Sequence, residues 1–275
     1  MLKTKEELRP PILDANALIE KINSGYVVNR VDKHQQKKTF APSTIAYSHG
    51  ECPRYWYLAF EGNVFENSDT PYGVANMTSG TMSHDRIQAA MMDSGIAKKF
   101  IDEAELEKTG KEVYTTEFKV VNSDPPIFGW GDAMLLIDGE EVVGEIKTMN
   151  NEAFEYRKLH KKPKAGHLIQ LLIYMKVLKK SKGVLIYENK NNHELLVLPI
   201  EVNDYYIKWV DQAFDWMRDV RKAWKDKTIP VKNYRSNSKI CKTCPLQKAC
   251  ASADPGTMKI KSLEPLDDTE ALPMV

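Results

Sequence analysis

The spacing of apolar residues predicts alternating helical and extended segments along most of the chain. Four segments carry apolar side chains every three or four positions, which is typical of amphipathic helices. They are residues 12–22, 80–92, 166–180 and a segment from Asn203 or Asp204 to about Lys227. Five other segments alternate in polarity or form short apolar runs, as strands do. They are residues 112–120, 128–137, 141–146, 183–187 and 195–200. This order predicts an α/β domain with a mixed sheet and helices packed on it.

One turn in this pattern predicts the pairing of two strands. Asp138-Gly139 separates the runs 128–137 and 141–146, and this dipeptide favours a tight hairpin because both of its residues adopt positive φ readily. A loop of two or four residues centred there places Asp132 directly opposite Glu145. Lys147 lies two residues beyond Glu145 and therefore on the same face of its strand.

This arrangement brings two carboxylates and an ammonium group together. Like charges directly opposite one another in a sheet are destabilising unless something compensates them, and a divalent cation would do so. Carboxylate oxygens suit Mg²⁺ or Mn²⁺, which polarise a phosphate and lower the pKa of a bound water. The pattern therefore suggests metal-assisted phosphodiester hydrolysis. The alternative is that Asp132 and Glu145 face solvent on a half-exposed sheet, where Lys147 neutralises them.

Composition and charge limit the other possibilities. The chain has 275 residues, of which 42% are hydrophobic and 28% charged, which excludes a fibrous or wholly disordered protein. It has no apolar stretch of membrane-spanning length and no apolar core of a secretory signal near Met1, so we expect a cytoplasmic protein with no membrane partner. The net charge is only +1. However, residues 157–192 carry ten Lys or Arg against Glu188 alone, which indicates either a track for a phosphate backbone or a solvated lysine face.

The four cysteines are spaced as metal ligands. Cys241, Cys244 and Cys250 follow a C-x2-C-x5-C pattern, and Cys52 is the only other cysteine in the sequence. Four soft ligands complete a tetrahedral site. The spacing does not choose between zinc and an iron-sulfur cluster, and unrelated buried thiols are the third possibility.

Several motifs together resemble a known nuclease family. The segment 129–148, which contains Gly131-Asp132 and Glu145-Ile146-Lys147, resembles the core of the PD-(D/E)XK nuclease superfamily. Gly80-x-x-x-His84, Gln170-x-x-x-Tyr174 and the cysteine spacing resemble its RecB-like iron-sulfur branch, which includes the CRISPR-associated four-cysteine exonucleases and the nuclease domain of AddB. The motifs occur in the expected order across residues 52–250.

The resemblance implies a fold, a domain organisation and a set of site residues. The fold is a restriction-endonuclease-like mixed central sheet flanked by helices, with the N- and C-terminal segments joined by a metal cluster. The resembling part would be a single nuclease domain over 41–260, with cluster-binding segments 52–60 and 241–250. The motifs do not extend to residues 1–40, whose own pattern predicts an extension, or to residues 261–275, whose acidic charge predicts a flexible tail. The implied metal ligands are His84, Asp132, Glu145 and the Ile146 carbonyl, and the implied catalytic residue is Lys147. Gln170 and Tyr174 would brace the site or contact DNA. A structural [4Fe-4S] cluster would be held by Cys52, Cys241, Cys244 and Cys250.

Each of these motifs also has an interpretation in which its residues have no catalytic role. A lone histidine such as His84 is commonly a surface or packed residue, and Gln170 and Tyr174, four positions apart, would also fit the edge of an apolar helix face.

The expected function is a Mg²⁺- or Mn²⁺-dependent DNA exonuclease that acts on single-stranded ends. Family precedent favours the 5′ to 3′ direction. A second hypothesis is a DNA-end-binding or adaptor protein in recombination or CRISPR adaptation, with a helicase, integrase or recombination partner and little turnover. A third is a zinc-stabilised structural protein.

Overall fold

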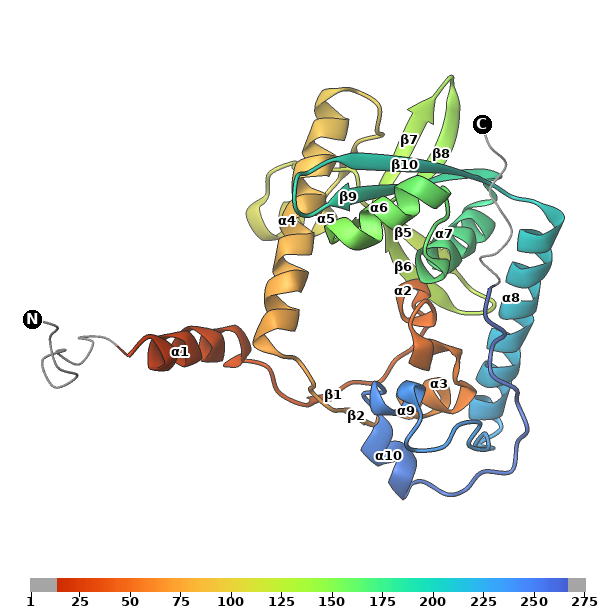
Figure 1. The fold of residues 1–275 in the computed structure, drawn as a ribbon. Helices are drawn as coiled ribbons and strands as arrows, with labels where there is room; N and C mark the ends of the chain where they lie inside the picture. Colours follow the sequence, from red (N-terminus) through yellow and green to blue (C-terminus); the bar gives the residue numbers. More distant parts are fainter. Residues whose placement is uncertain (1–13, 267–275) are drawn as a thin grey trace, which may run out of the picture.

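A four-stranded mixed sheet forms the centre of the structure, a computed structural model that describes residues 14–266 (Figure 1). Its strand order is β10-β9-β8-β7, with β8 and β9 parallel and the other two pairs antiparallel. The strands are β7 (Ala133–Ile137), β8 (Glu140–Met149), β9 (Lys182–Asn189) and β10 (Leu195–Glu201). The predicted mixed central sheet is therefore confirmed.

The hairpin between β7 and β8 has the predicted turn and register. Asp138 and Gly139 have φ values of 50° and 81°, and positive φ at both central residues is the mark of the hairpin turn that matches strand twist. The pairs run from Ile137 opposite Glu140 to Ala133 opposite Gly144. The register expected from the dipeptide is confirmed over these pairs.

The single strand predicted over 128–137 is wrong, because the chain leaves one sheet for another at Asp132. Residues before this point form β6 (Ile127–Gly131), which pairs with β5 (Phe118–Asn122) in a separate two-stranded sheet. The carbonyl oxygen of Asp132 accepts hydrogen bonds from side chains and is thus satisfied outside a ladder. The segment 112–120 is divided in the same way, into β5 and the short β4 (Tyr114–Thr115), which pairs with β3 (Phe100–Ile101).

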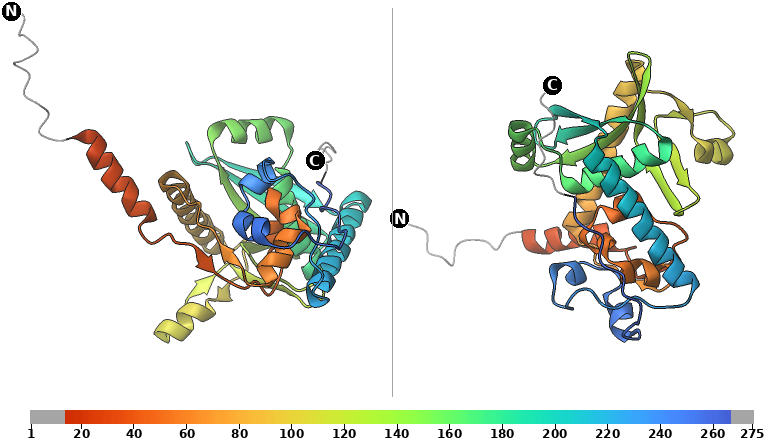
Figure 2. Two further views of the ribbon diagram at one scale, coloured as in Figure 1. Left: turned by 90° about the horizontal axis from the view of Figure 1, so that it is seen from below. Right: turned by 90° about the vertical axis from the view of Figure 1, so that its right-hand side faces the viewer.

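Helices cover both faces of the central sheet (Figure 2). On one face, α4 (Pro71–Asp93) packs Ile87 against alternate side chains of β7, β8 and β9. On the other, α7 (Ala165–Leu178) and α8 (Asp204–Lys225) share a larger apolar core with α3 (Pro53–Phe60). The helices predicted over 166–180 and from 203 or 204 to 227 are confirmed.

The helix predicted over 80–92 is the second half of a longer one. α4 begins nine residues earlier than its apolar stripe suggests, because the Thr70 hydroxyl caps it by accepting from the Gly73 N–H at 3.1 Å, with Pro71 in its first turn. Several shorter helices are too short or too polar to show an apolar stripe. They are α2 (Pro42–Ile45), the 3₁₀ helix η2 (Ser48–Glu51), α5 (Glu103–Thr109), α6 (Asn151–His160), α9 (Lys239–Lys242) and α10 (Gln247–Ser252).

The N-terminal part of the described chain projects from the rest. Helix α1 (Ala15–Val27) buries none of its residues and contacts α4 (Figure 1). It runs through Ser24 and Gly25, where the sequence pattern predicted its end, and residues 12 and 13 of the predicted helix lie outside the described part. Strand β1 (Lys33–His34) then pairs with β2 (Val64–Phe65) and returns the chain to the core.

The C-terminal boundary also differs from the prediction. Residues 261–266 were expected to begin a flexible tail, but they pack along α8, because Leu263 and Leu266 are apolar and become buried. Trp209 and Trp216 of α8 donate their indole N–H groups to the carbonyls of Glu264 and Lys261, at 3.0 and 2.8 Å. The rest of the predicted tail, residues 267–275, lies outside the described part. Between residues 14 and 266, no helix combines the length and apolarity needed to cross a membrane.

Candidate active site

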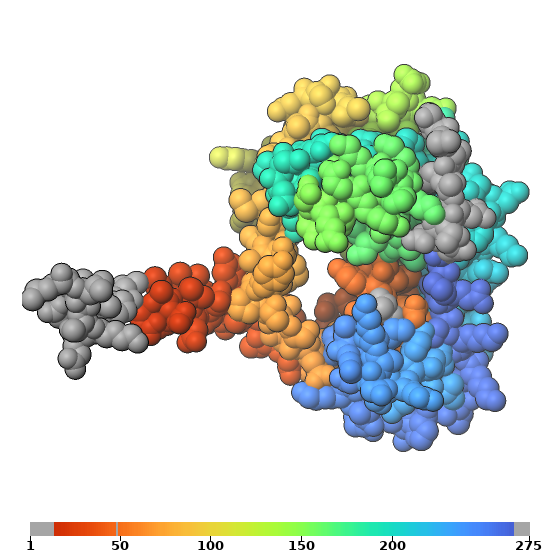
Figure 3. Space-filling view, in the orientation of Figure 1, coloured from red at the N-terminus to blue at the C-terminus, as the bar shows by residue number. Residues whose placement is uncertain are grey.

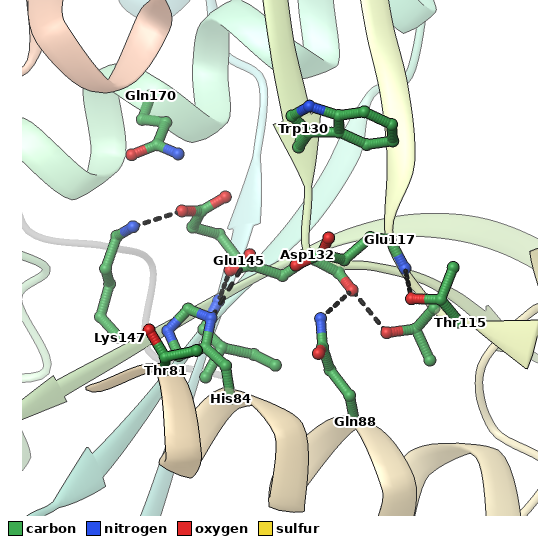
Figure 4. A network of polar contacts seen from close by, with 12 residues as sticks. Thr81, His84, Gln88, Thr115, Glu117, Trp130, Asp132, Glu145, Lys147 and Gln170 are labelled. Atoms are coloured by element: carbon green, nitrogen blue, oxygen red, sulfur yellow. Dashed lines mark hydrogen bonds and ion pairs between the residues drawn. The ribbon is translucent and has the colours of Figure 1, made fainter. Parts of the chain in front are cut away.

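Asp132 is held in place where the chain passes between the two sheets (Figure 4). Its Oδ2 accepts the backbone N–H of Ile146 on β8 at 2.6 Å. Its carbonyl oxygen accepts from Gln88 Nε2 at 2.9 Å and from Thr116 Oγ1 at 2.7 Å. Groups from α4, β8 and the segment before β5 therefore fix this one residue, which leaves Oδ1 available for another contact.

His84 approaches that second oxygen from α4. Its Nδ1 lies 3.5 Å from Asp132 Oδ1. Gln88, one helical turn further along, binds the Asp132 carbonyl, so two side chains on the same face of α4 contact the same residue. The structure thus brings together His84 and Asp132, as the motifs predicted.

Glu145 and Lys147 form a second pair beside Asp132. Glu145 is fully buried, and its Oε1 lies 2.5 Å from Lys147 Nζ. Apart from this contact with Lys147, the carboxylate oxygens of Glu145 have no hydrogen-bond partner among the described residues. Burial raises the pKa of Glu145, and the charge of Asp132 raises it further. Burial lowers the pKa of Lys147, but the two carboxylates outweigh this effect and its pKa is raised, which keeps the ammonium charged.

Two neighbouring residues were missed by the sequence analysis. Glu117 lies beside the site at the start of β5 (Figure 4), where burial and then the charge of Asp132 raise its pKa. His167 lies on α7 with its Nδ1 3.3 Å from the Tyr187 hydroxyl, and burial followed by the charge of Lys147 lowers its pKa to about 3. Neither belongs to a motif in the sequence. Glu117 lies between β4 and β5, where the strand expected over 112–120 is interrupted, and this interruption brings it near Asp132.

Gln170 and Tyr174 lie on α7 and contact each other and the strand before Asp132. Gln170 Nε2 donates to the Tyr174 hydroxyl at 3.2 Å, and that hydroxyl donates to the Trp130 carbonyl at 2.8 Å. A Cβ at Gly129 would be 2.9 Å from the same hydroxyl, so only glycine permits this approach. These contacts favour the bracing role for both residues.

We expect Tyr174→Phe to destabilise the protein by about 1 kcal/mol, because the substitution leaves the Trp130 carbonyl without its donor. The loosened strand carries Asp132, so cleavage of DNA should also slow by a few-fold. Urea unfolding and a cleavage assay measure the two effects. Tyr72→Phe is the matched control, because Tyr72 is 80% exposed. Equal behaviour of the two variants would show that the hydroxyl of Tyr174 does not brace the site.

The donor set at this site fits a hard divalent cation. Two carboxylates meet there with the single ammonium group of Lys147, and Glu145 is fully buried. The second negative charge is costly in this position unless a further positive charge compensates it. Nevertheless, within residues 14–266 no three His, Cys, Asp or Glu side chains are gathered tightly enough to hold a metal ion. His84 with Asp132 and Glu145 with Lys147 remain two adjacent pairs, and a cation site would require their carboxylates to close on it.

The four cysteines line one cavity at the opposite end of the molecule. Its volume is about 280 Å³, and it lies between α3 and the C-terminal helices α9 and α10. Burial raises the pKa of Cys52 to about 11 and that of Cys244 to about 12, with the charges of the other cysteines adding to the effect. The fold therefore brings Cys52 to the three late cysteines, although their side chains do not close on a single ion.

The basic segment 157–192 is partly neutralised by acidic residues elsewhere in the chain. Several of its lysines are paired with carboxylates of neighbouring elements. These pairs are Lys158–Glu194, Lys176–Asp211, Lys180–Glu141 and Lys182–Glu140. Lys164 directly precedes α7 and lies near His167, on the side of the active site.

Comparisons with known proteins place few constraints on the chain. No family model matches it, and no curated protein sequence matches it. Among solved structures, LHK-Exo, an alkaline exonuclease from Laribacter hongkongensis, is similar at a TM-score of 0.44 and 12% identity, covering 74% of this chain and 95% of that one. LHK-Exo in complex with dAMP gives a TM-score of 0.46 and 14% identity, over 76% and 93%. The structure of SSO0001 is similar at a TM-score of 0.39 and 15% identity, covering 88% of this chain and 98% of that one. These similarities are distant, so a function for this chain depends on its own residues.

Proposed function

We propose that this protein is a divalent-cation-dependent DNA nuclease. The observation that carries the proposal is the fully buried Glu145 carboxylate, which is paired with Lys147 and lies beside a second carboxylate, that of Asp132. Glu145 and Lys147 of β8, with Asp132 beside them, place charged groups in the protein interior, which lowers the stability of the fold. Hydrolysis of a phosphodiester is the chemistry that needs this set, because it requires a bound cation and a positive charge near the reacting phosphate.

The residues divide into ligands and a lysine. Asp132, Glu145, the Ile146 carbonyl and His84 would hold Mg²⁺ or Mn²⁺, which supplies a polarised phosphate and a water of lowered pKa when bound. Glu145 orients the Lys147 ammonium, which would donate to the attacking water or to a phosphate oxygen. The hydrogen bond from Ile146 N–H holds the Asp132 carboxylate in its position throughout.

We further propose that the substrate is a single-stranded end and that degradation runs 5′ to 3′. The space-filling view supports entry of a flexible strand, since an opening separates α4 from the segment that carries the late cysteines (Figure 3). A free end would pass this opening more easily than a duplex. The direction itself follows only the family resemblance of the motifs.

The four-cysteine cavity supports a structural [4Fe-4S] cluster as a second cofactor. The four thiols line one cavity, and the resemblance of their spacing to that of iron-sulfur nucleases favours a cluster over a single zinc ion. Such a centre would tie segment 52–60 to segment 241–250. Zinc is the alternative, and metal analysis separates the two.

The experiment that tests this function is degradation of end-labelled single-stranded DNA by anaerobically purified protein with Mn²⁺ or Mg²⁺. We expect progressive shortening by the wild type and none by Lys147→Ala or with a chelator. Lys208→Ala, which removes an exposed lysine of α8, should behave as wild type. A circular strand should resist if the enzyme needs an end, and the 5′ or 3′ position of the label gives the direction.

A DNA-end-binding or adaptor function is the second candidate, and α1 favours it. This helix exposes Leu18, Ile19 and Ile22, at 45%, 55% and 56%, on an arm that buries none of its residues. Such a surface suits contact with a recombination, helicase or integrase partner. If wild type and Lys147→Ala bind DNA equally and neither cleaves it, this function replaces the nuclease.

A further inference from the structure

Arg54 is a buried cation that reaches into the four-cysteine cavity. It is the second residue of α3, only 1% exposed, and its Nε donates to Cys250 Sγ at 3.2 Å. Its other two nitrogens donate to backbone carbonyls of the C-terminal segment. These are Pro230 (2.8 Å), Pro255 (3.1 Å), Cys250 (3.4 Å), Ala253 (3.3 Å) and Asp254 (2.5 Å).

The backbone around Arg54 is shaped to receive it. Gly256 has φ 87°, and a Cβ there would lie 2.5 Å from the Pro230 carbonyl oxygen. Glycine at position 256 therefore lets the segments around residues 230 and 255 approach closely enough for the carbonyls of both to face the guanidinium of Arg54. Arginine suits this position because its planar fork offers five N–H donors in fixed directions, which lysine lacks.

No carboxylate balances this charge within the described part of the chain. None of the ion pairs formed by residues 14–266 includes Arg54. Glu66 also lines the cavity, but its carboxylate binds the side chain of Lys248 at 2.7 Å. A buried charge is costly unless an opposite charge accompanies it. The sulfur atoms are the remaining groups in the cavity that carry negative charge when they bind metal.

We propose that Arg54 is the counter-ion and positioning residue of a metal-thiolate centre in this cavity. The inference rests on the proposed four-cysteine cofactor but not on its identity, because four thiolates leave a net negative charge around either zinc or a [4Fe-4S] cluster. Arg54 offsets that charge from within the fold. Its N–H to Cys250 Sγ also fixes the last of the four ligands.

This role has a measurable consequence for an iron-sulfur cluster. One-electron reduction adds a negative charge, which a nearby guanidinium and an N–H···S hydrogen bond both stabilise. Removing Arg54 therefore makes the cluster harder to reduce. A purely structural clip would alter the stability of the segment without moving the reduction potential of a cluster that is still fully bound.

The test compares Arg54→Gln, Arg54→Lys and the control Arg221→Gln in full-length protein reconstituted anaerobically. Arg221 is matched because its guanidinium packs on Phe60 and Trp224, at 4.6 and 4.1 Å from the ring centres, without a sulfur contact. Iron, sulfide and zinc are quantified first, and the cluster is then titrated with dithionite and followed by EPR. We expect the reduced-to-oxidised ratio of Arg54→Gln to fall at least tenfold at a fixed potential, equivalent to about 59 mV.

The outcomes separate this inference from the identity of the cofactor. Arg54→Lys keeps the positive charge but loses the planar guanidinium, so its reduction potential should lie between those of wild type and Arg54→Gln. If Arg54→Gln fails to fold, the potential of Arg54→Lys tests the inference instead. If the Arg54 variants bind a full complement of iron and have the same reduction potential as Arg221→Gln, the proposed role of Arg54 is overturned. If the protein holds zinc instead, the cluster proposal fails, and Arg54 is tested by zinc release to a chelator. Release from Arg54→Gln should be faster than from Arg221→Gln, and equal rates overturn the inference.

Discussion

Replacing Glu145 by leucine and Lys147 by methionine in one protein is expected to abolish DNA cleavage and, without added metal, to raise the free energy of unfolding by about 1 to 4 kcal/mol. The buried pair lies in the middle of β8, where apolar side chains of similar volume would pack without desolvating two charges. Cleavage should fall by more than about 100-fold, since the lysine and a ligand are both lost. Urea unfolding in EDTA and the end-labelled assay give the two values.

The single variants define what the double variant means. Glu145→Leu leaves a buried ammonium without this partner, and Lys147→Met leaves a buried carboxylate. The free energy of unfolding of each single variant should therefore be lower than that of wild type, by up to about 5 kcal/mol. A double variant less stable than wild type would contradict the expectation. The pair would then support the fold, and its burial would no longer require a catalytic explanation.

Replacing Cys244 by serine is expected to cause the largest loss of stability in the cysteine region. The four-cysteine centre would join α3 to the segment around α9 and α10, and binding free energies of structural metal sites reach about 10 kcal/mol or more in small domains. Metal content should fall, the melting temperature should drop, and residues near 230–255 should become sensitive to protease. DNA binding should weaken with them.

Lys242→Ala is the control for the cysteine variant, because it alters an exposed residue two positions away, at the end of α9. It should retain metal and the wild-type melting temperature. A Cys244→Ser protein that also retained both would show that the cavity holds no structural metal. The conclusion about the nuclease site would be unaffected, because the two sites are separate.

The elements that the sequence predicted well are those determined by neighbouring residues. Asp138-Gly139 sets the turn, and the turn sets which residues of β7 and β8 are paired. The result is that Glu145 and Lys147 share a face and form an ion pair, as expected from a period of two. The long helices α7 and α8 followed from their apolar stripes for the same reason.

The features that the sequence did not predict depend on contacts between distant segments. Asp132 ends one strand and begins another because Gln88 and Thr116 bind its carbonyl, and no local pattern signals either contact. Arg54 looks like an ordinary charged residue in a helix until the chain around 230–255 surrounds it. Glu117 joins the site only as a result of the broken strand.

The distance along the chain between the two halves of the cysteine cavity determines when it can form during synthesis. Arg54 and Cys250 are 196 residues apart, so the cavity is completed only after the chain has emerged from the ribosome beyond residue 250. The central sheet, built from residues 133–201, is available to fold well before then. Until the C-terminal segment arrives, α3 lacks part of its cover, and Trp56 and its aromatic neighbours are the surface most prone to misassociation. Insertion of the proposed cofactor is therefore expected to be a late step in biogenesis, and a supply of metal that comes too slowly should reduce the yield of folded protein rather than its activity per molecule.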